Sequence, residues 1–230
     1  DRDDRIEGRA LGPAEAAGTT PEGLLISAGT GETMAAAFGL GIGLGDAVVS
    51  LGASGSVMAV HPEALADSTG MITSLADATG MHLPVVTTLN AVRALRGAAE
   101  LLGVPDLEGL SELAMKSTPG SHGLVLLPYL EGERTPSLPH TAGTLAGLRR
   151  ESMKPEHLAR AAFEGMLCGL ADALDVLRGP IGEGDGHLFS RLPFAGRLRG
   201  AFPAAVLLAV VGDGGLDRIL GEDRAVDLDR

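Results

Sequence analysis

The chain has 230 residues, 45% hydrophobic and 21% charged, which is enough to bury the core of one large domain or two small ones. Its formal net charge of -12 repels phosphate backbones, and no stripe of Lys and Arg offsets it, so nucleic acid is excluded as an expected partner. The longest apolar run, 204–211, is too short to span a bilayer, and no basic leader opens the chain. We therefore expect a cytoplasmic protein with no membrane partner.

The beginning of the chain predicts a tail followed by a strand and a helix. Residues 1–20 are charged and rich in Gly and Ala without a period, which is typical of a tail or linker. A short apolar strand is expected at 23–27, before a glycine-rich turn. A weak helical stripe then follows at Met34, Ala37, Phe38 and Leu40.

The next segment predicts a run of strands. Two β-branched stretches within 46–60 are separated by a glycine-rich tetrapeptide, 52–55, which indicates a hairpin. Further strands are expected at 70–77 and 82–88. Because these strands precede any long helix, we expect an α/β domain built on a mixed sheet flanked by helices.

The second half of the chain predicts helices around one more strand. Apolar residues recur at helical spacing over 90–102, and a second, shorter helix is expected at 107–115. The continuous apolar stretch 123–130 predicts a buried strand, and a polar loop follows it. The pattern over 155–177 predicts a long amphipathic helix. The single cysteine, Cys168, excludes an internal disulfide and is expected to be a buried, inert thiol on this helix.

Two short motifs are open to two interpretations each. Glu32, which follows the turn residues Gly29 and Gly31, is either a catalytic base or an ordinary first-turn acid, which gains about 0.3 to 1 kcal/mol from the helix dipole. The tetrapeptide 52–55 either offers backbone amides to a phosphate or forms a plain hairpin turn. No spacing of the histidines suggests a metal cluster.

Two longer stretches carry a family resemblance. "LPYLEGERTP" at 127–136 joins an apolar stretch to a polar loop, and "GTLAGLRRESMKPEHLARAAFEG" follows at 143–165. Together they resemble the FGGY family of carbohydrate kinases, and within it the xylulokinases. The resemblance covers about residues 10–178 and implies an actin-like ATPase architecture, in which two ribonuclease-H-like domains close over ATP and sugar.

The resemblance also implies which residues do the chemistry. Residues 21–180 would form the core of the second domain, incomplete at its end, and the first domain would be a missing partner. Glu32 stands where these kinases place an aspartate that deprotonates the sugar hydroxyl. Gly52, Ala53, Ser54 and Gly55 stand where they place a phosphate-binding turn, with Ala53 in place of a threonine. ATP and Mg²⁺ are the implied cofactors, and a ketopentose is the implied substrate.

Two side-chain roles in the resembling stretches stay open. Glu133 and Arg134 either form an ion pair that anchors the loop, which we favour, or contact the ligand directly. His157 is expected to cap or line the long helix.

Residues 181–230 depart from the pattern of the family. They contain no Lys, have poor periodicity and lack the apolar strand that should precede an adenosine-binding turn. A shifted reading frame in GC-rich DNA would produce such a sequence, and a divergent C-terminal segment is the alternative.

Two functions therefore remain open for the chain. It is either part of an ATP-dependent sugar kinase or a non-catalytic fragment that keeps the fold as a binding module. Because an incomplete domain exposes apolar surface, self-association into a homo-oligomer is expected.

Overall fold

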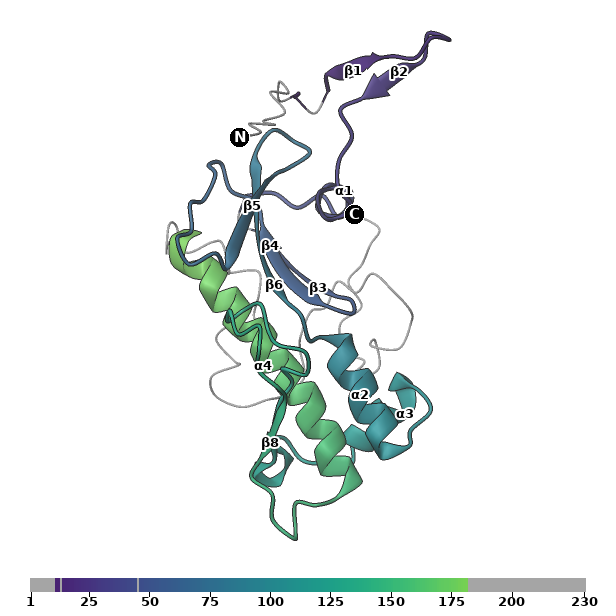
Figure 1. Cartoon of the computed structure of the whole chain (residues 1–230), viewed down its shortest axis with the longest axis vertical. Helices are drawn as coiled ribbons and strands as arrows, with labels where there is room; N and C mark the ends of the chain where they lie inside the picture. The colour runs from purple at the N-terminus through teal and green to yellow at the C-terminus, as the bar shows by residue number, and fades with distance from the viewer. Residues whose placement is uncertain (1–10, 13, 45, 182–230) are drawn as a thin grey trace, which may run out of the picture.

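A four-stranded sheet lies at the centre of the computed structural model, which describes residues 11–12, 14–44 and 46–181. Its strands lie in the order β3 (Ala47–Leu51), β4 (Gly55–Ala59), β6 (His82–Thr88) and β5 (Ile72–Ala76) (Figure 1). All their ladders are antiparallel, so the expectation of a mixed sheet is wrong for the described strands. The reason is that no helix crosses over between consecutive strands, as a parallel pair requires.

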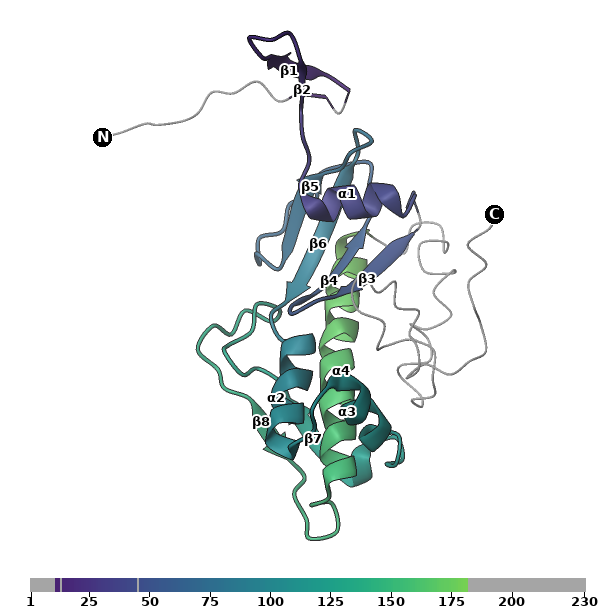
Figure 2. The same cartoon turned by 90° about the vertical axis from the view of Figure 1, so that its right-hand side faces the viewer.

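The sheet is covered on both faces, because its strands carry apolar residues in both directions. One face carries Met58 and Leu83 and is covered by helix α1 (Glu32–Gly39). The other face carries Val57 and Val86 and packs against the long helix α4 (Pro155–Ile181). Figure 2 shows α1 crossing one face of the sheet, with α4 running behind the other. Residues that alternate along one strand thus serve two separate cores.

Helices α2 and α3 follow the sheet and pack beside α4. Helix α2 (Val92–Leu102) ends at Gly103, whose φ of 66° is left-handed and favours glycine. Helix α3 (Leu107–Ala114) begins after Asp106, whose carboxylate accepts a hydrogen bond from the Gly109 amide at 2.8 Å. Both confirm the helices expected at these positions.

A small two-stranded sheet packs along α4. Strand β7 (Val125–Leu127) pairs with β8 (Thr144–Ala146), and β7 follows a 3₁₀ turn at Ser121–Gly123. The strand expected at 123–130 is confirmed over Val125–Leu127, but its expected burial is wrong, because Val125 is 51% and Leu127 44% exposed. Only one side of this short ladder contacts α4, so its other side faces solvent. Strand β8 was not expected.

The first described elements form a hairpin that projects from the rest of the chain (Figure 1). Strand β1 (Ala16–Thr19) pairs with β2 (Leu25–Ser27), so a strand occupies part of the segment expected to be a tail. The strand expected at 23–27 is confirmed. The backbone amide of Gly23 donates to the Thr20 carbonyl at 2.9 Å and closes the turn between the strands.

Two side chains differ from their expected burial. Phe38 is 63% exposed, because only the Met34 and Ala37 side of α1 packs on the sheet. Cys168 is exposed on α4, whereas the sequence predicts a buried thiol. Its pKa is nevertheless raised, first by partial desolvation and then by Asp172. The divergent segment, from 182 onward, lies outside the described residues.

Candidate functional site

The turn between β3 and β4 presents backbone amides to solvent. Leu51 pairs with Gly55 across the hairpin, and the Gly52 amide donates to the Ser54 carbonyl at 2.9 Å. Gly52, Ala53 and Ser54 are exposed. Within the part of the chain that the structure describes, the amides of Ala53 and Ser54 donate to no acceptor. The hairpin expected from the sequence is confirmed, and its tip offers two unused donors.

The start of α2 braces this turn from one side (Figure 2). The Val92 amide donates to the Gly52 carbonyl at 3.1 Å, and the amides of Ala91 and Arg93 donate to the Ala53 carbonyl at 3.3 and 3.4 Å. Turn carbonyls thus satisfy amides that a helix N-terminus leaves without intrahelical partners. The turn and the first turn of α2 therefore form one hydrogen-bonded unit.

Helix α4 packs directly against the last residue of the turn. A Cβ added to Gly55 would lie 2.6 Å from Leu170 Cδ2 and 2.8 Å from Thr88 Oγ1. Real Cβ atoms essentially never show contacts this short, so a larger residue at Gly55 would displace the Leu170 and Thr88 side chains. Gly55 therefore has a structural role in setting the distance between the turn and α4.

A buried carboxylate fixes the loop that precedes α2. Glu133 is 3% exposed, and its Oε1 accepts from the backbone amides of Leu89 at 2.5 Å and Arg134 at 2.7 Å. Its Oε2 accepts from Asn90 Nδ2 at 3.0 Å, and the same nitrogen donates to the Gly132 carbonyl at 2.7 Å. Three N–H donors thus compensate the buried charge. Because Asn90 precedes α2, this network reaches the turn through the helix start.

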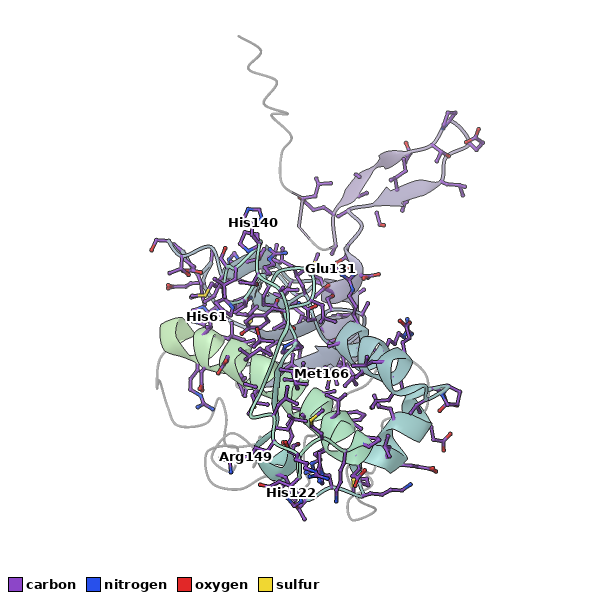
Figure 3. The ribbon with its side chains drawn as sticks, turned by 60° about the horizontal axis from the view of Figure 1, so that its bottom comes forward. His61, His122, Glu131, His140, Arg149 and Met166 are labelled. Atoms are coloured by element: carbon purple, nitrogen blue, oxygen red, sulfur yellow. The ribbon has the colours of Figure 1, made fainter. Side chains whose placement is uncertain are left out.

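The expected ion pair between Glu133 and Arg134 is wrong. Arg134 instead donates from its guanidinium to Thr73 Oγ1 at 3.2 Å, and only its backbone amide contacts the Glu133 carboxylate. The ion pair at this place joins Arg93 of α2 to Glu131, which Figure 3 labels, at 2.5 Å, and the two side chains are 47% and 69% exposed. Adjacent residues in the sequence thus point to different partners, a difference that no sequence pattern indicates.

Glu32 lies apart from the turn, in the first turn of α1. It is exposed, and its carboxylate forms no hydrogen bond or ion pair with another described residue. Gly29 has a φ of 74°, and Gly31 is the extended N-cap of the helix, so both shape the turn before Glu32 as expected. In Figure 2, α1 crosses the sheet away from the end where the β3–β4 turn meets α2. Gly52–Gly55 form one turn in the structure, and Glu32 forms no hydrogen bond with any residue of this turn.

A second polar cluster lies where α4 begins. His157 is 4% exposed, and its Nδ1 lies 2.8 Å from Ser117 Oγ. Its ring contacts that of His122, which Figure 3 labels, with centroids 4.2 Å apart and planes tilted by 35°. Burial, followed by the nearby His122, lowers the pKa of His157 below its ordinary value of 6.5. His157 therefore lines the helix as a neutral hydrogen-bonding group, as the sequence predicts.

Glu164, one helical turn beyond Arg160, holds the loop before β7. Its carboxylate accepts from the Gly120 amide at 3.0 Å, Ser121 Oγ at 2.9 Å and Arg160 Nε at 2.8 Å. With His157 it fastens the loop 117–123 to α4. All these acceptor positions are used within the protein, so this cluster is structural.

The described residues offer neither a metal site nor a membrane-spanning helix. No group of three or more His, Cys, Asp or Glu side chains is arranged to hold a metal ion. Among the described helices, none combines the length and the apolar character needed to cross a membrane.

The sequence matches a known family over most of its length. Residues 47–196 match the profile of the FGGY family of carbohydrate kinases, C-terminal domain. The chain therefore belongs to this family of ATP-using kinases. The matched region starts at β3 and runs beyond the last described residue, into the segment that the sequence pattern marks as divergent.

Several individual relatives of the chain are xylulose kinases. The chain is 42% identical over 177 residues to a xylulose kinase of Streptomyces rubiginosus, which covers 74% of this chain and 35% of the relative. A xylulose kinase of Haemophilus influenzae is 34% identical over 158 residues. The crystal structure of xylulose kinase from Bifidobacterium adolescentis superposes with a TM-score of 0.65 at 38% identity, over 74% of this chain and 35% of that one.

The matches cover most of this chain but only part of each relative. It spans about a third of the length of the curated relatives it matches. Residues 11–44, which hold the β1–β2 hairpin and α1, lie before the matched C-terminal domain. The contribution of α2 to the site is not predictable from local sequence, because 35 or more residues separate it from the turn and only the fold brings them together.

Proposed function

We propose that this chain is the C-terminal part of an ATP-dependent kinase that transfers the γ-phosphate of ATP to a hydroxyl of D-xylulose, forming xylulose 5-phosphate. The observation that carries the proposal is the exposed β3–β4 turn, with its unused amides, in a chain 42% identical to a xylulose kinase. The first domain of the kinase is a required partner. A cytoplasmic setting, with Cys168 reduced, fits this activity.

The residues of the turn fit a phosphate chemically. The amides of Ala53 and Ser54 and the Ser54 hydroxyl are exposed donors, and phosphate oxygens are acceptors. Ala53 removes the hydroxyl of the family threonine but keeps its backbone amide. Bound ATP supplies the phosphoryl group that is transferred. Mg²⁺ usually keeps several waters and binds through phosphates and one or two carboxylates, so the proposed ion needs no dedicated protein cage.

Glu32 is the proposed general base. Its carboxylate is exposed and has no competing partner among the described residues, so it is able to accept the proton of a sugar hydroxyl. A glutamate in the aspartate position extends the carboxylate by one methylene, and a misplacement of about 1 Å costs roughly 10²-fold in rate. The proposal also requires Glu32 to approach the turn when the kinase closes on its substrates.

The test uses a chimera that joins the preceding part of the Streptomyces rubiginosus relative to this chain. We expect xylulose-dependent release of ADP, lost by about 10²-fold or more in Glu32→Gln and retained or increased in Glu32→Asp. Glu100→Gln, an exposed acid on α2, is the matched control and should leave turnover unchanged. A folded chimera that releases no ADP with xylulose would overturn the proposal.

The second candidate is a non-catalytic fragment that retains the fold. Glu32 and Ala53, which depart from the family pattern at both key positions, favour it. This candidate predicts that the chimera binds nucleotide without turning over, and that Glu32→Asp brings no gain. Measured nucleotide binding together with ADP release therefore separates the two functions.

A further inference from the structure

The hydrogen bonds at the β3–β4 turn fix the direction of its two unused amides. A trans peptide group is planar, so its carbonyl and its N–H point in opposite directions. The Gly52 carbonyl shares a peptide group with the Ala53 N–H, and the Ala53 carbonyl shares one with the Ser54 N–H. Both carbonyls accept from the first amides of α2, at 3.1 to 3.4 Å. Both unused N–H groups therefore point away from α2.

Helix α2 also strengthens these two N–H groups as donors. The amides at a helix N-terminus carry the positive end of the helix dipole. A peptide group whose carbonyl accepts a hydrogen bond is polarised by it, which makes its own N–H a better donor. Among the described residues, no side chain caps α2, and its first turn holds no acid that would offset the positive charge. The start of α2 thus holds two polarised donors in a fixed direction.

Glu133 fixes the segment from which α2 begins. Its two carboxylate oxygens accept from the Leu89 amide at 2.5 Å and from Asn90 Nδ2 at 3.0 Å. The residues whose amides hold the turn, 91–93, follow directly in the chain. Because Ala91, the N-cap residue, has no side-chain oxygen to cap the helix, the entry into α2 depends on this carboxylate.

Asn90 contributes to this link only as a donor. Its Nδ2 donates to the Glu133 carboxylate and to the Gly132 carbonyl. Its Oδ1 is buried, and no described residue donates to it. A buried acceptor without a donor does not stabilise a fold. The link between Glu133 and α2 therefore depends on one nitrogen atom, which a substitution can replace by an oxygen.

We propose that Glu133 is a positioning residue for the phosphate-binding turn. It acts through Asn90 and the first turn of α2, which hold the Ala53 and Ser54 amides in the direction that a terminal phosphate of ATP requires. Glu133 is 3% exposed, so it acts without contacting the nucleotide. This inference rests on the proposed function in taking the turn as the phosphate site.

The first experiment measures the link in the chain itself. Glu133→Gln keeps one oxygen for the two backbone amides and turns an NH₂ group towards Asn90 Nδ2, so that two donors face each other. Hydrogen exchange at the Val92 amide reports whether α2 still holds the Gly52 carbonyl. We expect this amide to exchange about 10-fold faster than in the native chain. An unchanged rate would overturn the proposal.

Glu164→Gln is the matched control. Glu164 is also a carboxylate with three hydrogen bonds, but its partners, Gly120, Ser121 and Arg160, are not shared with the turn. Because sites without shared partners behave independently, exchange at Val92 should change by less than about twofold, even if the melting temperature falls. Equal acceleration in both variants would indicate general loosening of the fold and would overturn the proposal.

The second experiment measures turnover in the chimera with the Streptomyces rubiginosus relative. In Glu133→Gln we expect the KM for ATP to rise about 10-fold, while the KM for xylulose at saturating ATP changes by less than about twofold. A merely destabilised enzyme has fewer active molecules, which lowers kcat and leaves both KM values unchanged. A loss confined to kcat, or an equal rise in both KM values, would therefore contradict the positioning role.

Reversing donor and acceptor supplies a rescue. Asn90→Asp alone places two carboxylates against each other, so its KM for ATP should rise further than that of Glu133→Gln. When both substitutions are combined, the new carboxylate at position 90 accepts from the new amide at position 133. The KM for ATP should then return to within about threefold of the native value. A double variant no better than Asn90→Asp alone would overturn the proposal.

Calorimetric binding of ATP to the chimera separates the two proposals. A chimera that binds ATP but releases no ADP refutes the kinase function, and the positioning role stands if Glu133→Gln weakens that binding. A chimera that releases ADP, with an unchanged KM for ATP in Glu133→Gln, refutes the positioning role alone. A chimera that binds no ATP refutes both.

Discussion

The N-terminal segment (residues 14–44) and the sheet body (residues 46–181) differ in how far their apolar side chains are buried. In the body, the apolar side chains of β4, β6 and α2 are buried against α4, and Leu95 is 0% exposed. In the N-terminal segment, Leu25 is 77% exposed, and no other element of the described chain covers it. An apolar side chain is therefore buried only where another described element covers it.

The first prediction compares one leucine from each region. Leu95→Ala should lower the free energy of unfolding by about 2 to 5 kcal/mol, because it leaves a cavity in the core. Leu25→Ala should change it by less than about 0.5 kcal/mol, because the side chain is already in water. Urea unfolding followed by circular dichroism measures both. Equal losses would mean that the hairpin is packed within this chain.

The second prediction makes the same comparison for two neighbouring acids. Glu133→Ala leaves the Leu89 and Arg134 amides and Asn90 Nδ2 without their acceptor, so we expect a loss of roughly 2 to 4 kcal/mol in unfolding free energy. Glu131→Ala removes an exposed ion pair, for which less than about 1 kcal/mol is expected. If both variants unfold at the same urea concentration, the buried network does not stabilise the body.

The third prediction concerns the histidine cluster of the body. The pKa of folded His157 is lowered, so the unfolded chain takes up the proton first as pH falls. Stability should therefore be complete above about pH 6.5 and decrease below it. His157→Gln should flatten this decrease in melting temperature, whereas exposed His140→Gln should not. Identical pH profiles for the native chain and His157→Gln would contradict the assignment.

The smallest effect is expected in the exposed loop before β5. Hydrogen bonds from Thr69 and from the Ile72 amide lower the pKa of Asp67 to about 2, from an ordinary value of 3.8. The resulting stabilisation should be present above about pH 4 and disappear as pH falls towards 2. Melting temperatures of Asp67→Asn across this range should fall less than those of the native chain. An unchanged acid transition would rule out this contribution.

Local patterns predicted most of the elements of the body. The glycine-rich tetrapeptide between β-branched runs predicted the β3–β4 hairpin, and Gly103 marked the end of α2, because both signals act within a few residues. The stripe over 155–177 predicted α4, whose buried face includes Met166 and Leu177.

Long-range contacts account for what the sequence did not predict. The strand expected at 123–130 is short and exposed, because burial depends on which surfaces α4 covers. The acceptor role of Glu133 depends on Asn90, which is 43 residues away. The site residues at 52–55 were predicted as a turn, while the bracing of that turn by α2 becomes visible only in the structure. The role of Glu32 stays a prediction.

The length of α4 has a mechanical consequence. Its 27 residues extend roughly 40 Å at 1.5 Å per residue, from the histidine pair at its start to the sheet. Towards the sheet, Leu170 of α4 packs so close to Gly55 that an added Cβ there would lie 2.6 Å from Leu170 Cδ2. The same helix therefore contacts both the loop 117–123 and the end of the β3–β4 turn, so a change in the tilt of α4 is expected to displace both.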